Sequence, residues 1–524
     1  GFVREKIHRY IYLFGLGVIA FFMPISEFLT NACIIMLSTN YLIEANFKQK
    51  IKTISKNKEL LLFLLLFFIP LIWFFNSQNM EFALRDIKIR LPLLALPIII
   101  ASSKALNNKQ FKTIVFLFIA GVLTSTLAGL LAYLGIYFEL KSDNVRNYSV
   151  FISHITLSVM MSLAILLLAY FIIKRKFSKL IYYLIAIAII FWLMLFFALI
   201  QGFTGLGVLI VTSICVLAYK MFTHKNKKIK ILSFSVLILL IGSIAIYLSV
   251  QIKDFYTPSN PDIQLKEYTV YGNPYVSDTT VYLLENGNFI YYNVCEKELR
   301  VAWNNRSLMN FDGYDAKGQL LLHTIVRYMA SKGLDKDAEG FKELTDKDIV
   351  NIEAGHTNYR FVDKRGISQR VYNIIWQIDV YLKGVPPDGH SITQRFEFQK
   401  YGLILAKRNL LLGTGTGDLD DEYKAIYEEF DSKINIQNRH RAHNQFLTFY
   451  ITFGVIGASF CMLAWFYPIF TNFRSRSPYF ILFFLIASFS MFADDMLETS
   501  SAVVFISFFY SLFLWGIEQV KEKN

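Results

Sequence analysis

Long apolar runs separated by short polar segments dominate the chain, and one long polar stretch interrupts their succession. A run of about 20 apolar residues crosses the hydrocarbon core of a bilayer as a single helix, because a helix satisfies its own backbone hydrogen bonds. By this criterion the sequence predicts an α-helical polytopic membrane protein with about twelve transmembrane helices, near residues 9–25, 27–44, 59–75, 87–102, 111–136, 148–173, 179–200, 203–221, 229–250, 444–471, 478–494 and 499–517.

The polar stretch divides the chain into three parts. Residues 1–250 form an N-terminal membrane region of about nine spans, and residues 444–524 form a C-terminal membrane region of about three. Residues 251–443 are too many for a plain connection, so they predict a folded loop domain. The expected architecture has one large, mostly helical loop domain inserted before the last three spans.

Patterning inside the loop predicts its local structure. Val281–Leu284 and Phe289–Tyr292 flank Glu285–Asn288, whose Asn-Gly pair is typical of a β-hairpin turn. Leu320–Ser331 and Val371–Leu382 carry apolar residues at helical spacing, so we expect helices there.

Charge predicts the orientation of the spans. Basic turns follow the second, fourth, sixth, eighth and tenth spans, and both ends of the chain are basic, so the positive-inside rule places these parts in the cytoplasm. The loop domain is then periplasmic. The loop domain holds 24 Lys and Arg against 27 Asp and Glu, so its net charge is −3. Because the whole chain has a net charge of +13, the rest of the chain carries +16. This basicity is a topology signal, and it does not call for nucleic acid. No cleavable signal peptide is evident, so we expect the first span to be retained.

The junction at the end of the loop carries the chain's best candidate chemistry. His440, Arg441, His443 and Asn444 come directly before the apolar run that starts at Phe446. Side chains at this position are expected at the periplasmic membrane surface, facing water. Reactions on a lipid-linked substrate require groups at that depth.

Two arginines stand at the starts of predicted helices in the loop. Ser391-Ile392-Thr393-Gln394 has the capping-box pattern and places Arg395 in the first turn of a helix that runs to about residue 408. An arginine there opposes the helix dipole unless an anion is nearby. Arg370 follows a similar Ile-Ser-Gln sequence. The two arginines could converge on one anion. Alternatively, each is solvated or ion-paired, and the short echo is chance.

A glycine-rich turn, Gly413-Thr414-Gly415-Thr416-Gly417-Asp418, follows the second of these helices. It lacks the strand and the spacing of a dinucleotide-binding fingerprint, so we reject that interpretation. Its backbone N–H groups could bind an anion, or the turn could be a tight loop. The acidic residues after it suggest a metal site less than they suggest the charged start of a helix at about 420–432. The four cysteines show no metal-ligand or disulfide spacing.

Cations also gather at the outer entrances of two spans. Lys88 and Arg90 precede the fourth span and Arg146 precedes the sixth. Ionisable residues at membrane depth are functional candidates by default, although cations at helix ends also snorkel to the interface without a further role.

Several of these motifs occur in an order that resembles a known family. Ser391-Ile392-Thr393-Gln394-Arg395 comes first, then Gly413-x-Gly415-x-Gly417-Asp418, then Arg441-Ala442-His443-Asn444-Gln445-Phe446-Leu447 and Phe453-Gly454-Val455-Ile456-Gly457. Across about 370–457 the chain resembles the O-antigen ligase and polymerase superfamily, and more closely its ligase-like members with a long periplasmic loop. One departure is the turn at 201–205, where such proteins often carry Ser-Arg-Gly and this chain has no arginine.

The resemblance implies a glycosyltransferase of the bacterial inner membrane. It would have a GT-C-like fold and would move a glycan from undecaprenyl diphosphate to an acceptor hydroxyl at the periplasmic face, with lipid A-core as the expected acceptor, without a metal or other cofactor and with inversion. His443 would be the general base, and Arg370 and Arg395 would neutralise the diphosphate leaving group. The implied substrate-binding residues are Arg441, Asn444, Arg146, Arg90, Lys88, Gly413, Gly415 and Gly417.

Other functions use the same features. An O-antigen polymerase or a protein O-oligosaccharyltransferase would share the donor and differ in the acceptor. A flippase or transporter of lipid-linked glycan belongs to a different class, and it would favour internal repeats and sites at the membrane midplane. No repeat is evident among the spans, which weighs against transport.

Overall fold

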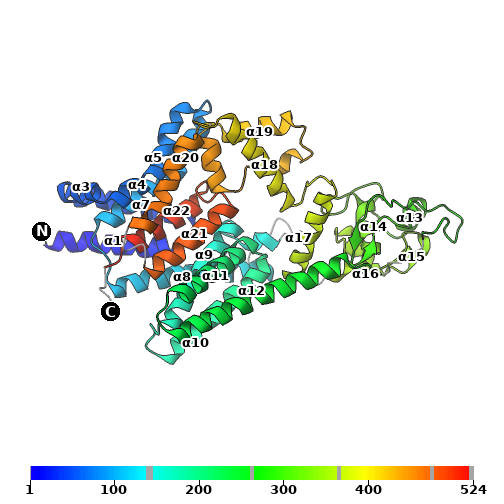
Figure 1. Ribbon diagram of the computed structural model, residues 1–524, viewed down its shortest axis with the longest axis horizontal. Helices are drawn as coiled ribbons and strands as arrows, with labels where there is room; N and C mark the ends of the chain where they lie inside the picture. The colour runs from blue at the N-terminus through cyan, green and yellow to red at the C-terminus, as the bar shows by residue number, and fades with distance from the viewer. Residues whose placement is uncertain (1, 137–144, 260–264, 363–366, 472–476, 519–524) are drawn as a thin grey trace. The chain divides into compact units, whose positions relative to one another are not determined.

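The computed structural model describes residues 2–136, 145–259, 265–362, 367–471 and 477–518, and it is mainly helical (Figure 1). The chain separates into two compact units. Unit 1 comprises residues 1–233 and 394–524, and unit 2 comprises residues 234–393.

The helices of unit 1 come from both ends of the chain. They are α1 (Phe2–Phe22), α2 (Glu27–Glu44), α3 (Phe47–Lys56), α4 (Lys58–Phe63), α5 (Leu65–Trp73), α6 (Met80–Arg90), α7 (Pro92–Ser102), α8 (Asn108–Tyr133), α9 (His154–Ile173), α10 (Leu180–Ile200), α11 (Phe203–Thr223), α18 (Thr393–Arg408), α19 (Leu419–Glu429), α20 (Gln445–Thr471), α21 (Pro478–Ala493) and α22 (Ser500–Leu514). Short 3₁₀ turns cover Phe74–Asn76, Val145–Tyr148 and Ile436–Asn438.

α9 and α22 lie at the centre of unit 1. Both are apolar on all sides, the pattern of a helix surrounded by other helices. α9 packs against α10, α11 and α21, while α22 packs against α7 and α21. α21 therefore packs against both central helices, and the segment that joins α21 to α22 is held between two packed helices.

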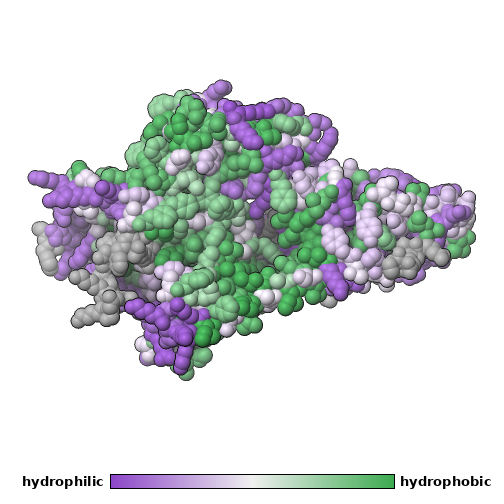
Figure 2. Space-filling model, in the orientation of Figure 1, coloured by the Kyte–Doolittle hydropathy of each residue, from purple (hydrophilic) through white to green (hydrophobic). Residues whose placement is uncertain are grey.

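The helical membrane character predicted from the sequence agrees with the described residues. Seven helices there are long and apolar enough to cross a membrane, or eight if the bent pair α2 and α3 forms one span. α21 and α22 are apolar but shorter. Hydrophobic residues cover much of the helical surface in Figure 2. The count of twelve spans stays a prediction.

α20 is interrupted at Gly454, whose backbone has φ +61° and ψ −173°. The N–H groups after this kink lose their partners within the helix and bond instead to an incoming segment: Val455 donates to the carbonyl of Leu410 at 2.8 Å. A side chain at Gly454 would collide with the Leu411 carbonyl group. The predicted tenth span is therefore two half-helices that share hydrogen bonds with residues 410–415.

Unit 2 contains most of α12 (Lys227–Tyr256) and a small folded domain. Its elements are β1 (Leu284–Glu285), β2 (Asn288–Phe289), α13 (Glu296–Asn304), α14 (Leu321–Ser331), α15 (Ala338–Lys342), α16 (Asp346–Glu353), a 3₁₀ turn (Tyr359–Phe361) and α17 (Ile367–Leu382). The antiparallel hairpin and the helix predicted at Leu320–Ser331 are confirmed, with shorter strands. Asn286 and Gly287 take positive φ values of 50° and 81°, as the Asn-Gly turn requires.

A buried carboxylate organises unit 2. Glu285 is fully buried and pairs with Arg327 at 2.8 Å, and it accepts hydrogen bonds from Asn358 and Tyr372. The Arg327 guanidinium also lies over the Trp376 ring at 3.9 Å from its centre. The charges of Glu285 and Arg327 thus neutralise each other inside the domain, so this cluster stabilises the fold.

The division of the chain differs from the predicted boundaries at 250 and 443. Residues 394–443 belong to unit 1, because α18 and α19 share a buried core with α20 that includes Leu405, Tyr423 and Ile451. The sequence predicts that α18 has an apolar face, but it does not indicate which helix packs against that face. The end of the loop is therefore part of the body that carries the junction at His443.

Candidate functional site

Three carboxylates lie on the link of residues 494–499 between α21 and α22. Asp494 is the residue directly after α21, Asp495 follows it, and Glu498 comes just before α22. Because both helices are held by packing, the link presents these groups at a fixed place in unit 1. Asp494 and Glu498 pair with residues of the junction that precedes α20, and Asp495 accepts a hydrogen bond from Thr448 within α20.

His443 pairs with the first of these carboxylates. Its Nδ1 lies 2.8 Å from Asp494 Oδ1, and both side chains are partly exposed. His443 has a backbone φ of 49°, and the next residue, Asn444, caps α20 by accepting hydrogen bonds from the N–H groups of Phe446 and Leu447. With the proton on Nδ1 donated to Asp494, the Nε2 atom of His443 carries a lone pair that can accept a proton.

Arg395 supplies positive charge next to this pair. Burial alone would raise the pKa of Asp494, but the hydrogen bond from His443 and the charges of His443 and Arg395 lower it below its usual value. Arg395 lies in the first turn of α18, as predicted, and it forms no ion pair within the described ranges. The Asp494 carboxylate is therefore held ionised beside a cation that remains available.

A chain of buried ion pairs surrounds the other end of the link. Arg90 is 2% exposed, and its Nε lies 2.7 Å from Asp86 while its Nη2 pairs with Glu498. Arg441 pairs with Glu498 at 3.1 Å and with Asp420. These contacts connect α6, the start of α19, the junction before α20 and the link into one charged network.

The pKa values of Asp495 and Glu498 are shifted in opposite directions. Burial raises the pKa of Glu498, but the charges of Arg90 and Arg441 outweigh it and bring the value to about 2. Burial, together with repulsion from Glu498 and Asp494, raises the pKa of Asp495 to about 6. Thr448 donates a hydrogen bond of 2.7 Å to Asp495.

The same groups could hold a cation. Ligand atoms of His443, Asp494 and Asp495 lie within 4.8 Å of one another, a spacing that suits a divalent metal. Binding an ion through His443 Nδ1 would require breaking its hydrogen bond to Asp494, and the charge of Arg395 opposes a second cation. The arrangement suits a hydrogen-bonded acid–base pair better than a metal centre.

The sequence matches no family model and no curated protein. The resemblance to the O-antigen ligase and polymerase superfamily therefore stays a prediction, and the geometry of the site has to support any function by itself.

The structure corrects the predicted role of the N–H groups in the glycine-rich turn. Gly413 N–H donates to Asn409, Gly415 N–H to Thr452 and Gly417 N–H to the Ser77 hydroxyl, so these donors are used inside the protein. A Cβ at Gly417 would lie 2.1 Å from the Asn79 carbonyl oxygen. The three glycines permit close backbone packing, and the prediction that they bind an anion through their N–H groups is wrong.

Asp420, Asp421 and Glu422 lie in the first turn of α19, as predicted, whereas Asp418 caps a different helix. Asp418 makes no side-chain capping bond to α19. Its carboxylate instead accepts from the N–H groups of Gln78 and Asn79 at the start of α6, the nearest contact being 2.7 Å. This contact ties the glycine-rich turn to the helix that carries Arg90.

Three predicted substrate-binding residues have structural partners instead. Arg90 and Arg441 use their guanidinium groups in the buried ion pairs, and the Asn444 side chain caps α20. These contacts engage all three side chains, and the Arg90 Nη1 atom is buried without a hydrogen-bond partner among the described residues. The contact of these three residues with substrate stays a prediction. Lys88 is exposed on α6, and its role stays a prediction. The side chain of Arg146 lies outside the described residues.

Arg370 belongs to unit 2 and is described there. Helix α17 begins at Ile367, four residues before the predicted start, so Arg370 lies in its first turn. Its Nη2 donates to the Ser391 hydroxyl at 2.8 Å. Ser391 is therefore an acceptor for Arg370, and α18 starts at Thr393 without the predicted capping box. A joint role of Arg370 and Arg395 stays a prediction.

Sequence reasoning missed Asp494, Asp495 and Glu498. The sequence Ala493-Asp494-Asp495-Met496-Leu497-Glu498 contains three carboxylates between two apolar runs, which is a signal by the rule that ionisable groups at membrane depth are functional candidates. The expected orientation of the spans also places this link on the same side as His443.

Proposed function

We propose that this chain is a glycosyltransferase that moves a glycan from undecaprenyl diphosphate to an acceptor hydroxyl at the periplasmic face of a bacterial inner membrane, with ligation to lipid A-core as the preferred reaction. The observation that carries the proposal is the pair of His443 and Asp494 beside Arg395, at the start of an apolar helix. A base and a cation placed together suit a reaction that removes a hydroxyl proton and releases an anion.

The proposed step uses the two nitrogen atoms of His443 differently. Nδ1 donates to Asp494, and Nε2 takes the proton of the acceptor hydroxyl as its oxygen attacks the anomeric carbon. The bond between that carbon and the diphosphate oxygen breaks, and its electron pair stays on the diphosphate. In-line attack inverts the configuration at the anomeric carbon. Asp494 stabilises the imidazolium that forms.

The leaving diphosphate needs positive charge and no proton. Arginine binds phosphate oxygens through two parallel N–H groups and stays charged at any relevant pH. Arg395 is free of carboxylate partners in the described ranges, and its charge is felt by Asp494. We assign the diphosphate to Arg395, and the role of Arg370, which belongs to unit 2, stays a prediction from the sequence.

The test compares two histidines of one junction. His443→Ala should lower glycan transfer in reconstituted vesicles by about 10²- to 10⁴-fold, the usual contribution of a general base. His440→Ala is the matched control, because the His440 ring lies 5.8 Å from that of His443 without a carboxylate partner of its own in the described structure. Equal activities for the two variants would refute the assigned base.

Substitution of the arginine tests the leaving group. Arg395→Lys keeps the charge and loses the planar fork, so transfer should fall while binding of an uncharged glycan stays unchanged. Full activity would argue against bidentate diphosphate binding. Adding a chelator to the wild-type assay separates this mechanism from a metal centre at His443 and Asp494, since chelation should leave transfer intact.

The acceptor is identified by a deletion experiment. In cells that lack the gene, accumulation of long chains on the lipid carrier with a bare core indicates a ligase, whereas single repeat units on the core indicate a polymerase. Intermediates retained on the cytoplasmic side would indicate a flippase and would refute the proposal.

A further inference from the structure

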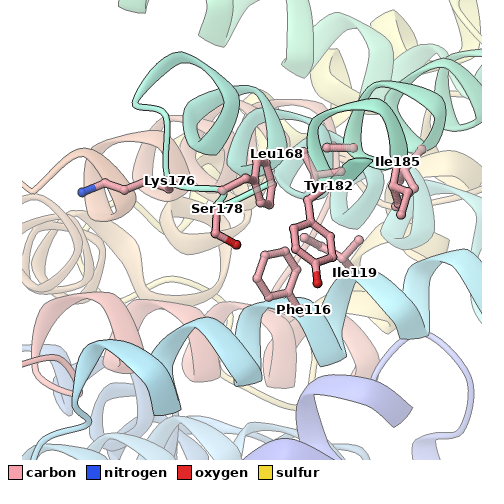
Figure 3. Close-up of a pocket in the computed structure, with 10 residues that line it drawn as sticks. Phe116, Ile119, Leu168, Lys176, Ser178, Tyr182 and Ile185 are labelled. Atoms are coloured by element: carbon pink, nitrogen blue, oxygen red, sulfur yellow. The ribbon is translucent and has the colours of Figure 1, made fainter. Parts of the chain in front are cut away.

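An apolar hollow lies in unit 1 between α8, α9 and α10. Its volume is about 390 Å³, within the range of roughly 300–1,000 Å³ in which small-ligand pockets fall. Ile119, Leu168 and Ala186 are buried at its floor, while Tyr182 and Ile185 are exposed at its rim. Figure 3 shows the side chains of Phe116, Ile119 and Tyr182 gathered around the hollow.

The hollow lies beside a basic turn. Lys174, Arg175, Lys176 and Lys179 join α9 to α10, all four are exposed, and none forms an ion pair within the described ranges. The Lys176 ammonium points away from the hollow in Figure 3, while Lys176 and Ser178 line its edge. Unpaired positive charge therefore stands at the mouth of an apolar space that opens along a hydrophobic helix surface.

This hollow is remote from the candidate catalytic groups. Phe116, which lines it, contacts the Phe171 ring, and Phe171 contacts Tyr479 at the start of α21. Asp494 follows the other end of that helix. Fifteen residues separate Tyr479 from Asp494, so at 1.5 Å per residue they stand roughly 22 Å apart along the helix axis. The hollow and the pair of His443 and Asp494 are thus at opposite ends of α21.

We propose that this hollow binds an anionic glycerophospholipid of the surrounding bilayer, with an acyl chain between α8 and α10 and the phosphate headgroup at Lys174, Lys176 and Lys179. The apolar lining suits a hydrocarbon chain, and the unpaired lysines are complementary to an anionic headgroup. The positive-inside pattern expects this turn in the cytoplasmic leaflet, whereas the proposed glycan donor is used at the other face. The bound lipid is therefore a structural partner distinct from the substrate.

The first experiment removes the charge. The full chain is reconstituted with spin-labelled phosphatidylglycerol or phosphatidylcholine, and the fraction of motionally restricted label is measured for each. The wild type should prefer phosphatidylglycerol, and K174Q/K176Q/K179Q should lose that preference, by on the order of fivefold per lysine close to the headgroup. K48Q/K52Q/K56Q is the matched control, because these three lysines are exposed on another basic helix, α3.

The second experiment fills the hollow. Ile185 lines it and is 48% exposed, whereas Ile187 on the same helix is 53% exposed and lies outside the lining. Ile185→Trp should reduce the restricted phosphatidylglycerol, and Ile187→Trp should leave it unchanged. Both substitutions are at exposed positions, so neither disturbs the helix core.

Four results would overturn the proposal. The wild type could restrict phosphatidylcholine as much as phosphatidylglycerol, the α3 variant could lose the preference as fully as the α9–α10 variant, or undecaprenyl phosphate could displace the label from this site. Retention of the preference in K174Q/K176Q/K179Q would overturn it as well.

Discussion

The two ends of the 494–499 link hold carboxylates in opposite situations. Asp494 pairs with one ionisable side chain, His443, whose charge can change, and is 19% exposed, whereas Glu498 pairs with two arginines and is 12% exposed. A carboxylate with one partner can still respond to a reaction, because its partner's charge changes when a proton arrives. A carboxylate that is paired with two arginines has partners whose charge does not change when a proton arrives. The first arrangement suits catalysis and the second suits structure.

The largest expected effect is at the clamped end. Glu498→Gln removes the charge that Arg90 and Arg441 share, while Arg90 keeps Asp86 and Arg441 keeps Asp420 as a partner. Breaking a buried ion pair by removing one partner costs about 3–5 kcal/mol of folding free energy, and this sets the upper end of the expected loss. The variant should unfold at a markedly lower temperature in detergent. Since its pKa is lowered, Glu498 contributes stability that is present above about pH 4.3 and lost as the pH falls toward 2, so the deficit should shrink in acid.

Glu428→Gln is the control for this variant, because Glu428 is exposed on α19. An unfolding temperature of Glu498→Gln equal to that of the control would show that the charged network does not stabilise the fold.

The other end should behave in the opposite way. Asp494→Asn leaves a similar shape but removes the charge that holds the Nδ1 proton of His443, so glycan transfer should fall by about 10²- to 10⁴-fold. The unfolding temperature should change little, because the side chain is partly exposed. If Asp494→Asn lowered the unfolding temperature and left the rate of glycan transfer unchanged, Asp494 would have a structural role and no catalytic one.

A substitution in the glycine-rich turn tests whether its packing against the start of α6 stabilises the fold. Gly417→Ala places a methyl group 2.1 Å from the Asn79 carbonyl oxygen, and forced repacking of this kind costs about 1–3 kcal/mol. Gly207→Ala is the matched control, since no atom lies within 4 Å of its Cβ position. A lower affinity for diphosphate donor at normal stability would restore the anion-binding interpretation of the turn.

The smallest expected effect is at Asp495, between the two ends. Because its pKa is raised to about 6, its stability contribution is present below about pH 3.9 and lost as the pH rises through 6. Asp495→Asn avoids this loss, so the variant should unfold at a higher temperature than the wild type at pH 8 and at the same temperature near pH 3.5. A variant that is less stable at pH 8 would show that the Asp495 charge is stabilising.

Much of the architecture could be predicted because it depends on local patterns. Apolar runs predicted the membrane helices, Asn286 and Gly287 predicted the hairpin, and the junction sequence predicted His443 as a solvent-facing group before an apolar helix. Arg395 was expected in the first turn of a helix and lies there.

The partners of these residues could not be predicted, because they depend on tertiary contacts between distant segments. Asp494 is 51 residues from His443, and Glu498 is 408 residues from Arg90. Without those contacts, Arg90 and Arg441 resembled free cations, and Gly413 and Gly417 resembled an anion-binding turn. A short motif shows which hydrogen-bond donors are present, but only the tertiary structure shows which of them already have an acceptor.

The break in α20 at Gly454 has a consequence for how the chain enters the membrane. The half-helix before the break has only nine residues, too few to cross a bilayer, and the N–H groups of Val455 and Ile456 find their acceptors at Leu410 and Leu411. We expect the two half-helices to reach their final form only once residues 410 and 411 lie beside the break, because those carbonyl groups supply the acceptors that the helix itself lacks.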